Sequence, residues 1–369
     1  MSEFTERVTR KNKGQTNLPL TISAQYGLVD QISFFNNKVA SADMSNYYLL
    51  KKGEFTYNKS YSTDYPLGAI KRLDRYEMGA LSTLYICFKI NGDIESDFLV
   101  HYFESPKWHR GVYEIAGEGA RNHGLLNIAV GDFFETQHFR PKSIREQEKI
   151  AHFLTLIQHR IEVQSGLIED LQKLKAALVE RLFCNKLGWK RYKYRDLLSP
   201  ISERNSGNQF SNVLSASQEL GMVSRTDLDI DIKFDRSAVT TYKIVRDGDY
   251  VLHLRSFQGG LAFSSMTGIC SPAYTILRPV KELEYGFFQE YFMSKSFINS
   301  LRLVTYGIRD GRSINVDEFL DMPVEIPDSA TQCRIISILS IMNRHLRLAI
   351  KQNENFIKQK QYLLQQMFI

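Results

Sequence analysis

The sequence predicts an α/β (α+β) protein in which two β-rich modules are separated by two long coiled-coil helices. Three observations predict this architecture. The chain repeats itself about 185 residues apart, and each copy ends in a long segment with a 3.5-residue apolar period. The rest of each copy contains short apolar runs broken by Gly and Asp turns. We expect modules at 1–143 and 187–328, and helices at 144–186 and 329–369.

Within the modules, the repeat is carried by scattered anchors. Loops drift in length more easily than helices do, so scattered anchors are typical of loop-rich modules. The β-rich runs lie at 81–90, 250–254 and 273–277. The matched anchors are Gly53-Glu54-Phe55 with Gly248-Asp249-Tyr250, Ser82-Thr-Leu-Tyr85 with Ser271-Pro-Ala-Tyr274, and Gly119, Arg121 and Asn127 with Gly307, Arg309 and Asn315. The second copy also carries a preamble at 188–192 that the first copy lacks.

In the long segments the register is strict. From Gln147 and Gln332 to Phe183 and Phe368, the two copies align without a gap over 37 residues. Pro141 and Pro327 precede these segments, where the chain can turn before a helix begins. The seams are Ile150, Leu154, Ile157, Ile161, Gln164, Ile168, Leu171, Lys175, Leu178 and Leu182, and Ile335, Leu339, Met342, Leu346, Ala349, Asn353, Phe356, Lys360, Leu363 and Met367.

Lys175 and Lys360 interrupt the two seams at equivalent positions. They could form polar layers that fix the register of the helix pair, as polar seam residues commonly do. They could equally extend their stems along the seam and place the ammonium group in solvent. If the two helices pair with each other, an antiparallel arrangement would set the modules at opposite ends.

Composition is that of an ordinary globular chain. It has 369 residues, with 43% apolar and 24% charged residues, and a formal net charge of +6. No apolar run reaches the ~18–20 residues that span a bilayer, and the N-terminus lacks the apolar core of a secretory signal. Cys87, Cys184, Cys270 and Cys333 form no C-x-x-C pair. We therefore expect a cytoplasmic chain with reduced, mostly buried thiols, no membrane partner and no metal site.

Catalytic motifs are weak or absent. Ser271-Pro-Ala-Tyr274 loosely resembles the (D/N/S)-P-P-(Y/F) motif of amino-methyltransferases, but its third position differs and its repeat equivalent has no proline. We interpret it as the start of a strand. The glycine-rich segment 117–124 fits neither a dinucleotide loop nor a phosphate loop. The eight histidines show no H-E-x-x-H or other paired metal spacing.

Polar and basic loops at corresponding places in both modules suggest contact with DNA. Arg and Lys can pair with guanine, and Asn and Gln with adenine, while basic clusters neutralise phosphates. For any single residue, a solvated loop without a partner is an equally open reading. The candidate DNA contacts are Asn58, Lys59, Ser60, Tyr61, Lys71, Arg72, Arg121, Arg255, Ser256, Gln258, Tyr306, Arg309 and Arg312.

Nearly the full chain resembles a specificity (S) subunit of a type I restriction–modification system. The most specific parts are 146–151, which open the first long segment with Glu-Gln-Glu-Lys-Ile-Ala, and 178–183, which end it. The segments 57–60 and 248–251 resemble the family's recognition domains. Two features depart from the family pattern: Thr331-Gln332-Cys333-Arg334-Ile335 lacks its usual E-Q, and the N-terminus is short.

The resemblance implies two target recognition domains separated by two long antiparallel coiled-coil helices. Each domain would read half of a bipartite double-stranded DNA site, and the helix pair would act as a ruler for the gap. The helices would bind two methyltransferase (M) subunits and, through them, restriction (R) subunits. The residues expected to carry this contact are Gln147, Ile150, Leu154, Leu178, Gln332, Ile335, Leu339 and Leu363.

The same resemblance places catalysis outside this chain. S-adenosylmethionine, ATP and magnesium would bind the partner subunits, and this chain would bind no cofactor and be no enzyme. The alternatives are a stand-alone DNA methyltransferase or nuclease, and a coiled-coil adaptor without DNA contact.

Overall fold

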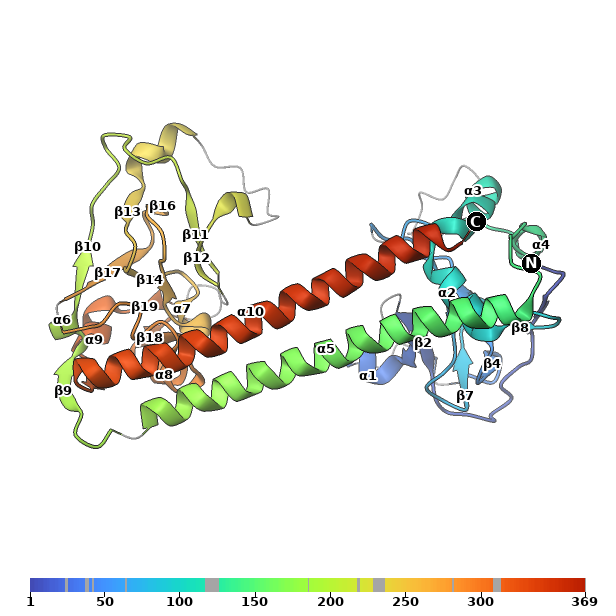
Figure 1. The fold of residues 1–369 in the computed structure, drawn as a ribbon, viewed down its shortest axis with the longest axis horizontal. Helices are drawn as coiled ribbons and strands as arrows, with labels where there is room; N and C mark the ends of the chain where they lie inside the picture. The colour runs from blue at the N-terminus through green and yellow to red at the C-terminus, as the bar shows by residue number, and fades with distance from the viewer. Residues whose placement is uncertain are drawn as a thin grey trace. The chain divides into compact units, whose positions relative to one another are not determined.

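The computed structural model describes residues 1–23, 26–36, 40–41, 43–63, 65–116, 126–184, 186–217, 220–227, 236–280, 282–307 and 313–368 (Figure 1). The chain forms two compact units. Unit 1 comprises Met1–Ser165 and Lys351–Ile369, and unit 2 comprises Gly166–Ile350. Because both long helices cross these divisions, each unit contains one module and one end of each helix.

Module 1 is built on a four-stranded antiparallel sheet of order β1-β8-β5-β6, with two further strand pairs, β2-β3 and β4-β7. Short helices and one 3-10 turn cover it. The strands are β1 Thr5–Arg7, β2 Leu20–Ser23, β3 Gly27–Asp30, β4 Tyr48–Lys51, β5 Phe55–Asn58, β6 Ala69–Arg72, β7 Met78–Leu81 and β8 Ile86–Ile90. The helices are α1 Gln31–Phe35, α2 Ser96–Glu104, η1 Pro106–Trp108, α3 His109–Ile115 and α4 Val130–Glu135.

Module 2 repeats this topology. Its four-stranded sheet has the order β10-β17-β14-β15, and its strand pairs β11-β12 and β13-β16 correspond to β2-β3 and β4-β7. The strands are β9 Lys190–Lys193, β10 Leu198–Ile201, β11 Leu214–Ser217, β12 Gly221–Ser224, β13 Lys243–Val245, β14 Tyr250–Leu252, β15 Ala262–Phe263, β16 Gly268–Cys270, β17 Thr275–Pro279, β18 Thr305–Tyr306, β19 Ser313–Ile314 and β20 Pro323–Ile326. The helices are α6 Tyr194–Leu197, η2 Arg225–Asp227, η3 Arg236–Thr241, α7 Ser256–Gly259, η4 Tyr291–Met293, α8 Lys295–Ser300, η5 Leu301–Val304 and α9 Val316–Asp321.

The preamble found only in the second copy forms an additional strand. Lys190–Lys193 becomes β9 and pairs antiparallel with β20, immediately before the second long helix. No counterpart of this pair occurs among the strands described in unit 1. There, the Met1 amino group instead donates to the Thr136 carbonyl at 2.6 Å.

The β-rich run at 81–90 contains the last residue of one strand and the whole of the next. β7 ends at Leu81, Ser82–Tyr85 forms a turn, and β8 begins at Ile86. The equivalent Ser271–Tyr274 turns in the same way before β17, with the Tyr274 amide donating to the Ser271 carbonyl at 3.0 Å. The methyltransferase-like tetrapeptide is therefore a turn that precedes a strand, where the sequence-based interpretation expected the start of the strand itself.

The predicted long helices are α5 (Ile144–Cys184) and α10 (Ser329–Gln366). Every seam position of both helices is buried or half-buried, and most flanking positions are exposed. In unit 1 the helices run antiparallel, because Asn353 bonds Ser165 at 3.3 Å whereas Lys360 bonds the earlier residue Gln158 at 2.7 Å. The coiled-coil period was thus a correct guide to the buried face.

The helix ends belong to the module cores. In unit 1, Leu154 and Phe368 pack with sheet residues such as Phe88 in one buried cluster. In unit 2, Phe183 and Leu339 join the equivalent cluster with Tyr250. Burial of large apolar side chains is the main stabilising contribution to such a junction. Each module and its helix ends therefore share one core.

Burial also distinguishes the cysteines. Cys87 and Cys270 are buried, and burial raises the pKa of each thiol to about 12. Cys184 and Cys333 are exposed, so the expectation of mostly buried thiols holds for only half of them. Among the helices described, none has the length and apolar character needed to cross a bilayer.

Candidate nucleic-acid interface

In module 1 the candidate loop follows the central strand β5. Asn58 ends the strand, and its side-chain oxygen accepts the Ser60 amide at 3.0 Å, so this loop begins with a tight local turn. The Lys59 carbonyl accepts the Leu126 amide at 2.9 Å. Ser60 and Tyr61 are exposed. Loop 58–61 thus lies beside Leu126.

Module 2 presents its loop at the corresponding place, after β14. Arg255 and Gln258 are exposed, whereas Ser256 is buried and its hydroxyl accepts the His253 amide at 2.8 Å. The helix α7 that contains Ser256 packs against β19. Two groups of predicted contacts, around Arg255 and around Tyr306 of the β18–β19 hairpin, therefore share one region of the module.

A glycine holds each of these loops in place. Gly68 and Gly260 have positive φ angles of +78° and +77°, which L side chains rarely adopt. A Cβ at Gly68 would lie 2.1 Å from the Asn58 carbonyl oxygen, and one at Gly260 would lie 1.8 Å from that of Phe292. The backbone is therefore closely packed beneath both loops, as required to position surface side chains.

Several candidates are engaged within their own unit. Lys71 lies 3.6 Å from Glu104, and Arg72 contacts Asp74 and Asp97 at 2.7 Å each. Burial would lower the pKa of Arg72, but these carboxylates outweigh it and raise that pKa. DNA contact by Lys71 and Arg72 would compete with these ion pairs.

Tyr306 is 54% exposed, although its hydroxyl donates to Glu318 at 2.6 Å. Arg121, Arg309 and Arg312 lie outside the described residues. DNA contact by the candidate residues remains a prediction.

The predicted partner-binding residues of the helices face inward. Gln147, Leu154, Gln332, Ile335 and Leu339 are buried, and the remaining three are half-buried. The half-buried ones are Ile150, Leu178 and Leu363. Their side chains pack within their own unit, so little of their surface is available to a partner.

Gln147 and Gln332 are hydrogen-bonded in the same way. Each side-chain oxygen accepts a module amide at 2.9 Å, from Glu95 and Glu284 respectively. Each side-chain nitrogen donates to the carbonyl of the preceding proline, at 2.8 Å to Pro141 and 3.1 Å to Pro327. These glutamines therefore attach the start of each long helix to its module.

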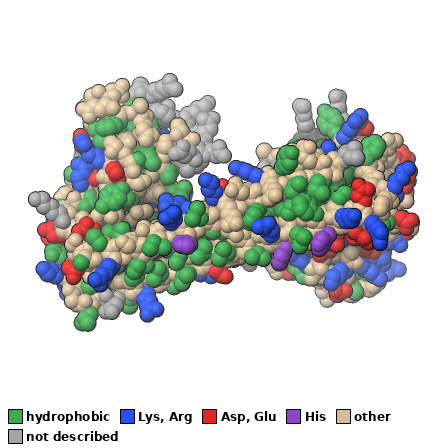
Figure 2. Space-filling model, in the orientation of Figure 1, with side chains coloured by type: hydrophobic (Ala, Val, Ile, Leu, Met, Phe, Trp, Pro, Cys, Tyr) green, Lys and Arg blue, Asp and Glu red, His purple; other side chains and the backbone are tan. Residues whose placement is uncertain are grey.

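A different apolar surface on the helices is exposed. It consists of Phe153, Leu156 and Val163 on α5 in unit 1, and of Ile338, Ile341 and Leu348 on α10 in unit 2, with exposed fractions between 43% and 59%. We call each set an exposed stripe. The two sets are equivalent at the offset of 185. Figure 2 shows hydrophobic side chains exposed along the helical part of the face drawn.

Sequence reasoning missed these stripes because it followed only the strongest apolar period. The missed signal was a second set of apolar residues that lies beside the seam in both copies. Its second member follows the first by three residues, and its third follows the second by seven. Large apolar side chains that remain exposed in a row often mark an interaction surface.

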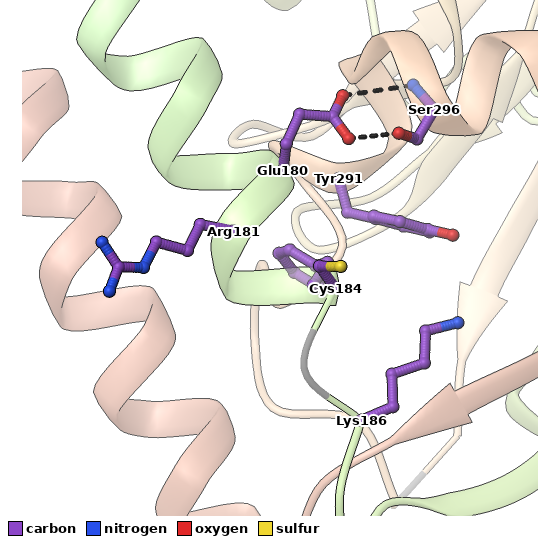
Figure 3. A pocket seen from close by; sticks show the side chains of 7 residues that line it. Glu180, Arg181, Cys184, Lys186, Tyr291 and Ser296 are labelled. Carbon is purple, nitrogen blue, oxygen red and sulfur yellow. Dashed lines mark hydrogen bonds between the residues drawn. The ribbon is translucent and has the colours of Figure 1, made fainter.

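A shallow hollow lies at the C-terminal end of α5 (Figure 3). It is lined by Glu180, Arg181, Phe183, Cys184, Lys186, Tyr291 and Ser296. Both Glu180 carboxylate oxygens accept from Ser296, one from its hydroxyl and one from its amide. The carboxylate is thus used to join α5 to the N-terminus of α8.

Within the described parts of the chain, no group of three or more His, Cys, Asp or Glu residues could hold a metal ion.

Two comparisons by sequence find nothing: no protein-family model matches this chain, and neither does any curated protein. Solved structures do match it. A chain from a structure describing complex assembly and conformational transition of the type I R-M system aligns with TM-score 0.60 and 13% identity, over 98% of this chain and 95% of that one. The S subunit of a type I restriction-modification system from M. genitalium aligns with TM-score 0.53 and 12% identity, over 100% of this chain and 94% of that one. At these identities, the likeness shows a shared fold.

Proposed function

We propose that this chain is the DNA sequence-recognition subunit of a type I restriction–modification complex. One observation carries the proposal: the chain contains the same sheet topology twice, and each copy supports a surface loop beside its central strand. The loops differ in sequence, with Asn-Lys-Ser-Tyr at 58–61 and Arg-Ser-Phe-Gln at 255–258. Two similar domains with different loops are suited to reading two different half-sites. The shared fold of the solved S subunit supports this.

In this proposal the long helices set the gap between the half-sites and dock the methyltransferase subunits. The exposed stripes support docking, because the same apolar surface occurs once on α5 and once on α10. Two equivalent surfaces would bind two copies of one partner, and the restriction subunits would join through these M subunits. We propose that the complex acts on double-stranded DNA in the cytoplasm.

Chemistry belongs to the partners in this proposal. S-adenosylmethionine would bind the methyltransferase subunits, and ATP and magnesium would serve cleavage by the restriction subunits. This chain would contribute orientation and sequence choice, without a catalytic residue of its own.

Methylome sequencing of cells that express this chain with its partners tests the proposal. We expect a bipartite motif with two half-sites and one gap length. Arg255→Ala should lower the discrimination against wrong bases in the half-site read by module 2, by about 1–3 kcal/mol per lost base contact. Lys59→Ala should affect only the other half-site. Equal loss on both half-sites in either variant contradicts the assignment.

The enzyme alternative has its own outcome in the same system. If the purified chain alone methylates DNA with S-adenosylmethionine, or cleaves it with magnesium, the chain is a stand-alone enzyme and the proposal is wrong.

A further inference from the structure

In unit 1, the two long helices and the module meet at one ammonium group, that of Lys360. Glu104 ends α2 of the module, and the Lys360 ammonium of α10 lies 2.7 Å from its Oε2 atom. The same ammonium donates to Oε1 of Gln158 on α5 at 2.7 Å. Lys360 is thus a bridge between both helices and the module.

Unit 2 contains the equivalent arrangement. Lys175 of α5 lies 2.7 Å from Oε2 of Glu290, and Asn343 of α10 donates to Oε1 of the same carboxylate at 2.6 Å. Lys175 corresponds to Lys360, and Asn343 to Gln158, at the offset of 185. The module, α5 and α10 are therefore joined in both units by the same kinds of group.

These contacts are shielded from solvent. The side chain of Lys360 is 13% exposed, and that of Glu290 is 10% exposed. Removing one partner of such a pair leaves an uncompensated charge in a poorly hydrated place, so the geometry is strongly held. Burial raises the pKa of Glu104, but the His101 ring, 3.6 Å away, and the charges of Lys360 and Lys71 outweigh it and lower that pKa.

A second attachment lies elsewhere along each helix. Gln147 and Gln332 bind the modules 11 residues before Gln158 and Asn343 respectively. At 1.5 Å per residue, these two attachments are separated by about 16 Å along the helix axis. Together with the apolar core that each module shares with its helix ends, polar contacts at separate points along a helix define the direction of the module.

We propose that the Lys360–Glu104 and Lys175–Glu290 clusters, called here the couplings, are positioning elements that fix each module on its helix pair and so make gap selection sharp. This inference rests on the proposed function. One base pair changes the separation of two half-sites by about 3.4 Å and rotates one relative to the other by about 35°. A helix pair of fixed length selects one gap only if each module moves on its helices by less than the shift and rotation that one base pair produces.

The couplings exclude one of the two sequence-based hypotheses for the seam lysines, the extension of the ammonium group into solvent. Lys360 does form a polar contact between the helices, with Gln158, and each ammonium group also pairs with a carboxylate of a module. The contact with Gln158 bears on the register of the two helices, and the contacts with Glu104 and Glu290 bear on the orientation of the modules.

The test uses the complex with its methyltransferase subunits and a DNA library in which both half-sites are separated by varied gaps. We expect Lys360→Met and Lys175→Met each to reduce the preference for the native gap over gaps one base pair longer or shorter by about fivefold or more. Both half-site sequences should stay unchanged. Lys360→Arg should restore the preference, and Lys358→Met, at an exposed position of the same helix, should not alter it.

A structural role alone would weaken methylation equally at every gap, and that result overturns the proposal. So does an unchanged gap preference in the double variant Lys175→Met, Lys360→Met.

A second measurement does not depend on DNA. Spin labels at Lys107→Cys in module 1 and Gln172→Cys on α5, with Cys184 and Cys333 replaced by serine, report how freely the module moves on the helix. We expect a broader distance distribution with Lys360→Met, and an unchanged width refutes the coupling. If the unmodified complex shows no gap preference, the proposed function fails, and the label distances still decide whether the couplings hold the modules.

Discussion

At the scale of single residues, the repeated anchors mark points where the backbone turns. Glu54 and Asp249 each follow a glycine with positive φ and accept an amide three residues earlier in the chain, from Lys51 and Arg246, at 2.8 Å. Asp249 also binds Arg278. The similarity of the two copies at these positions is explained by turn geometry. It requires no contact with a ligand.

His138 illustrates how one buried side chain couples stability to pH. The Thr136 hydroxyl donates a hydrogen bond to the Phe133 carbonyl. Its oxygen therefore accepts a hydrogen bond from Nε2 of His138 at 2.8 Å. Nδ1 then accepts from the Tyr102 hydroxyl at 2.9 Å. This arrangement requires a neutral ring. Burial, with a smaller contribution from the Met1 ammonium group, lowers the pKa of His138 to about 4.

We therefore predict that stability falls as the pH drops from about 6.5 toward 4. In that range the unfolded chain binds a proton at this histidine and the folded chain does not, so acid favours unfolding. The contribution amounts to about 2–3 kcal/mol. Urea unfolding at several pH values measures it. His138→Gln, which stays neutral and can keep both hydrogen bonds, should flatten the slope, and the exposed His159→Gln should not. An unaltered slope in His138→Gln would show that the ring is not held neutral.

At the scale of elements, α5 and α10 each have two apolar surfaces that differ in burial. The seam is buried within the units, and the exposed stripes are not. The strict register of 37 residues follows from both, because an insertion would rotate every later side chain away from its partner.

We predict that Leu156→Asp and Ile341→Asp each remove one docked methyltransferase subunit. These side chains are 49% and 58% exposed, so the folded chain should lose little stability, whereas a buried carboxylate at an apolar interface is strongly unfavourable. Native mass spectrometry should show two bound subunits for the unmodified chain, one for each variant and none for the double variant. Gln172→Asp, at an exposed polar position of α5, serves as the control. Two subunits still bound to the double variant would exclude the stripes as the docking surface.

At the scale of the whole molecule, the chain combines one helix pair with two modules of the same topology. The modules differ where their loops reach the surface and agree where they meet the helices, at Gln147 and Gln332 and at the couplings. This distribution fits the proposal that the helix pair is a constant scaffold and that the two modules recognise different DNA half-sites.

We predict that a seven-residue insertion in both helices, after Ser165 and after Ile350, lengthens the preferred DNA gap by about three base pairs. Seven residues preserve the 3.5-residue period and add about 10.5 Å to the scaffold. The gap lengths of methylated sites measure the effect. Insertion of four residues in one helix alone disrupts the seam and should abolish binding or shift the gap, with the half-sites unchanged. An unshifted gap after the paired insertion would contradict the ruler.

Much of the fold was accessible from the sequence. The start of each long helix after Pro141 or Pro327, the buried face of each helix, and the duplication follow from local periodicity and spacing, which depend on neighbouring residues in one element. The loops at 58–61 and 255–258 were also found as candidates, because polar turns between apolar runs are visible in the sequence.

The tertiary structure alone decided what the side chains contact. Gln147 and Leu154 were expected at a partner surface and lie inside their own unit, while Leu156, two residues further along, is exposed. Lys175 and Lys360 lie in the seam, but the carboxylates that pair with them belong to Glu290 and Glu104, more than a hundred residues away in the chain. The sequence determined which faces are apolar and where the chain repeats, because these depend on local order. Which polar groups meet depends on packing between distant segments, and only the folded chain settles that.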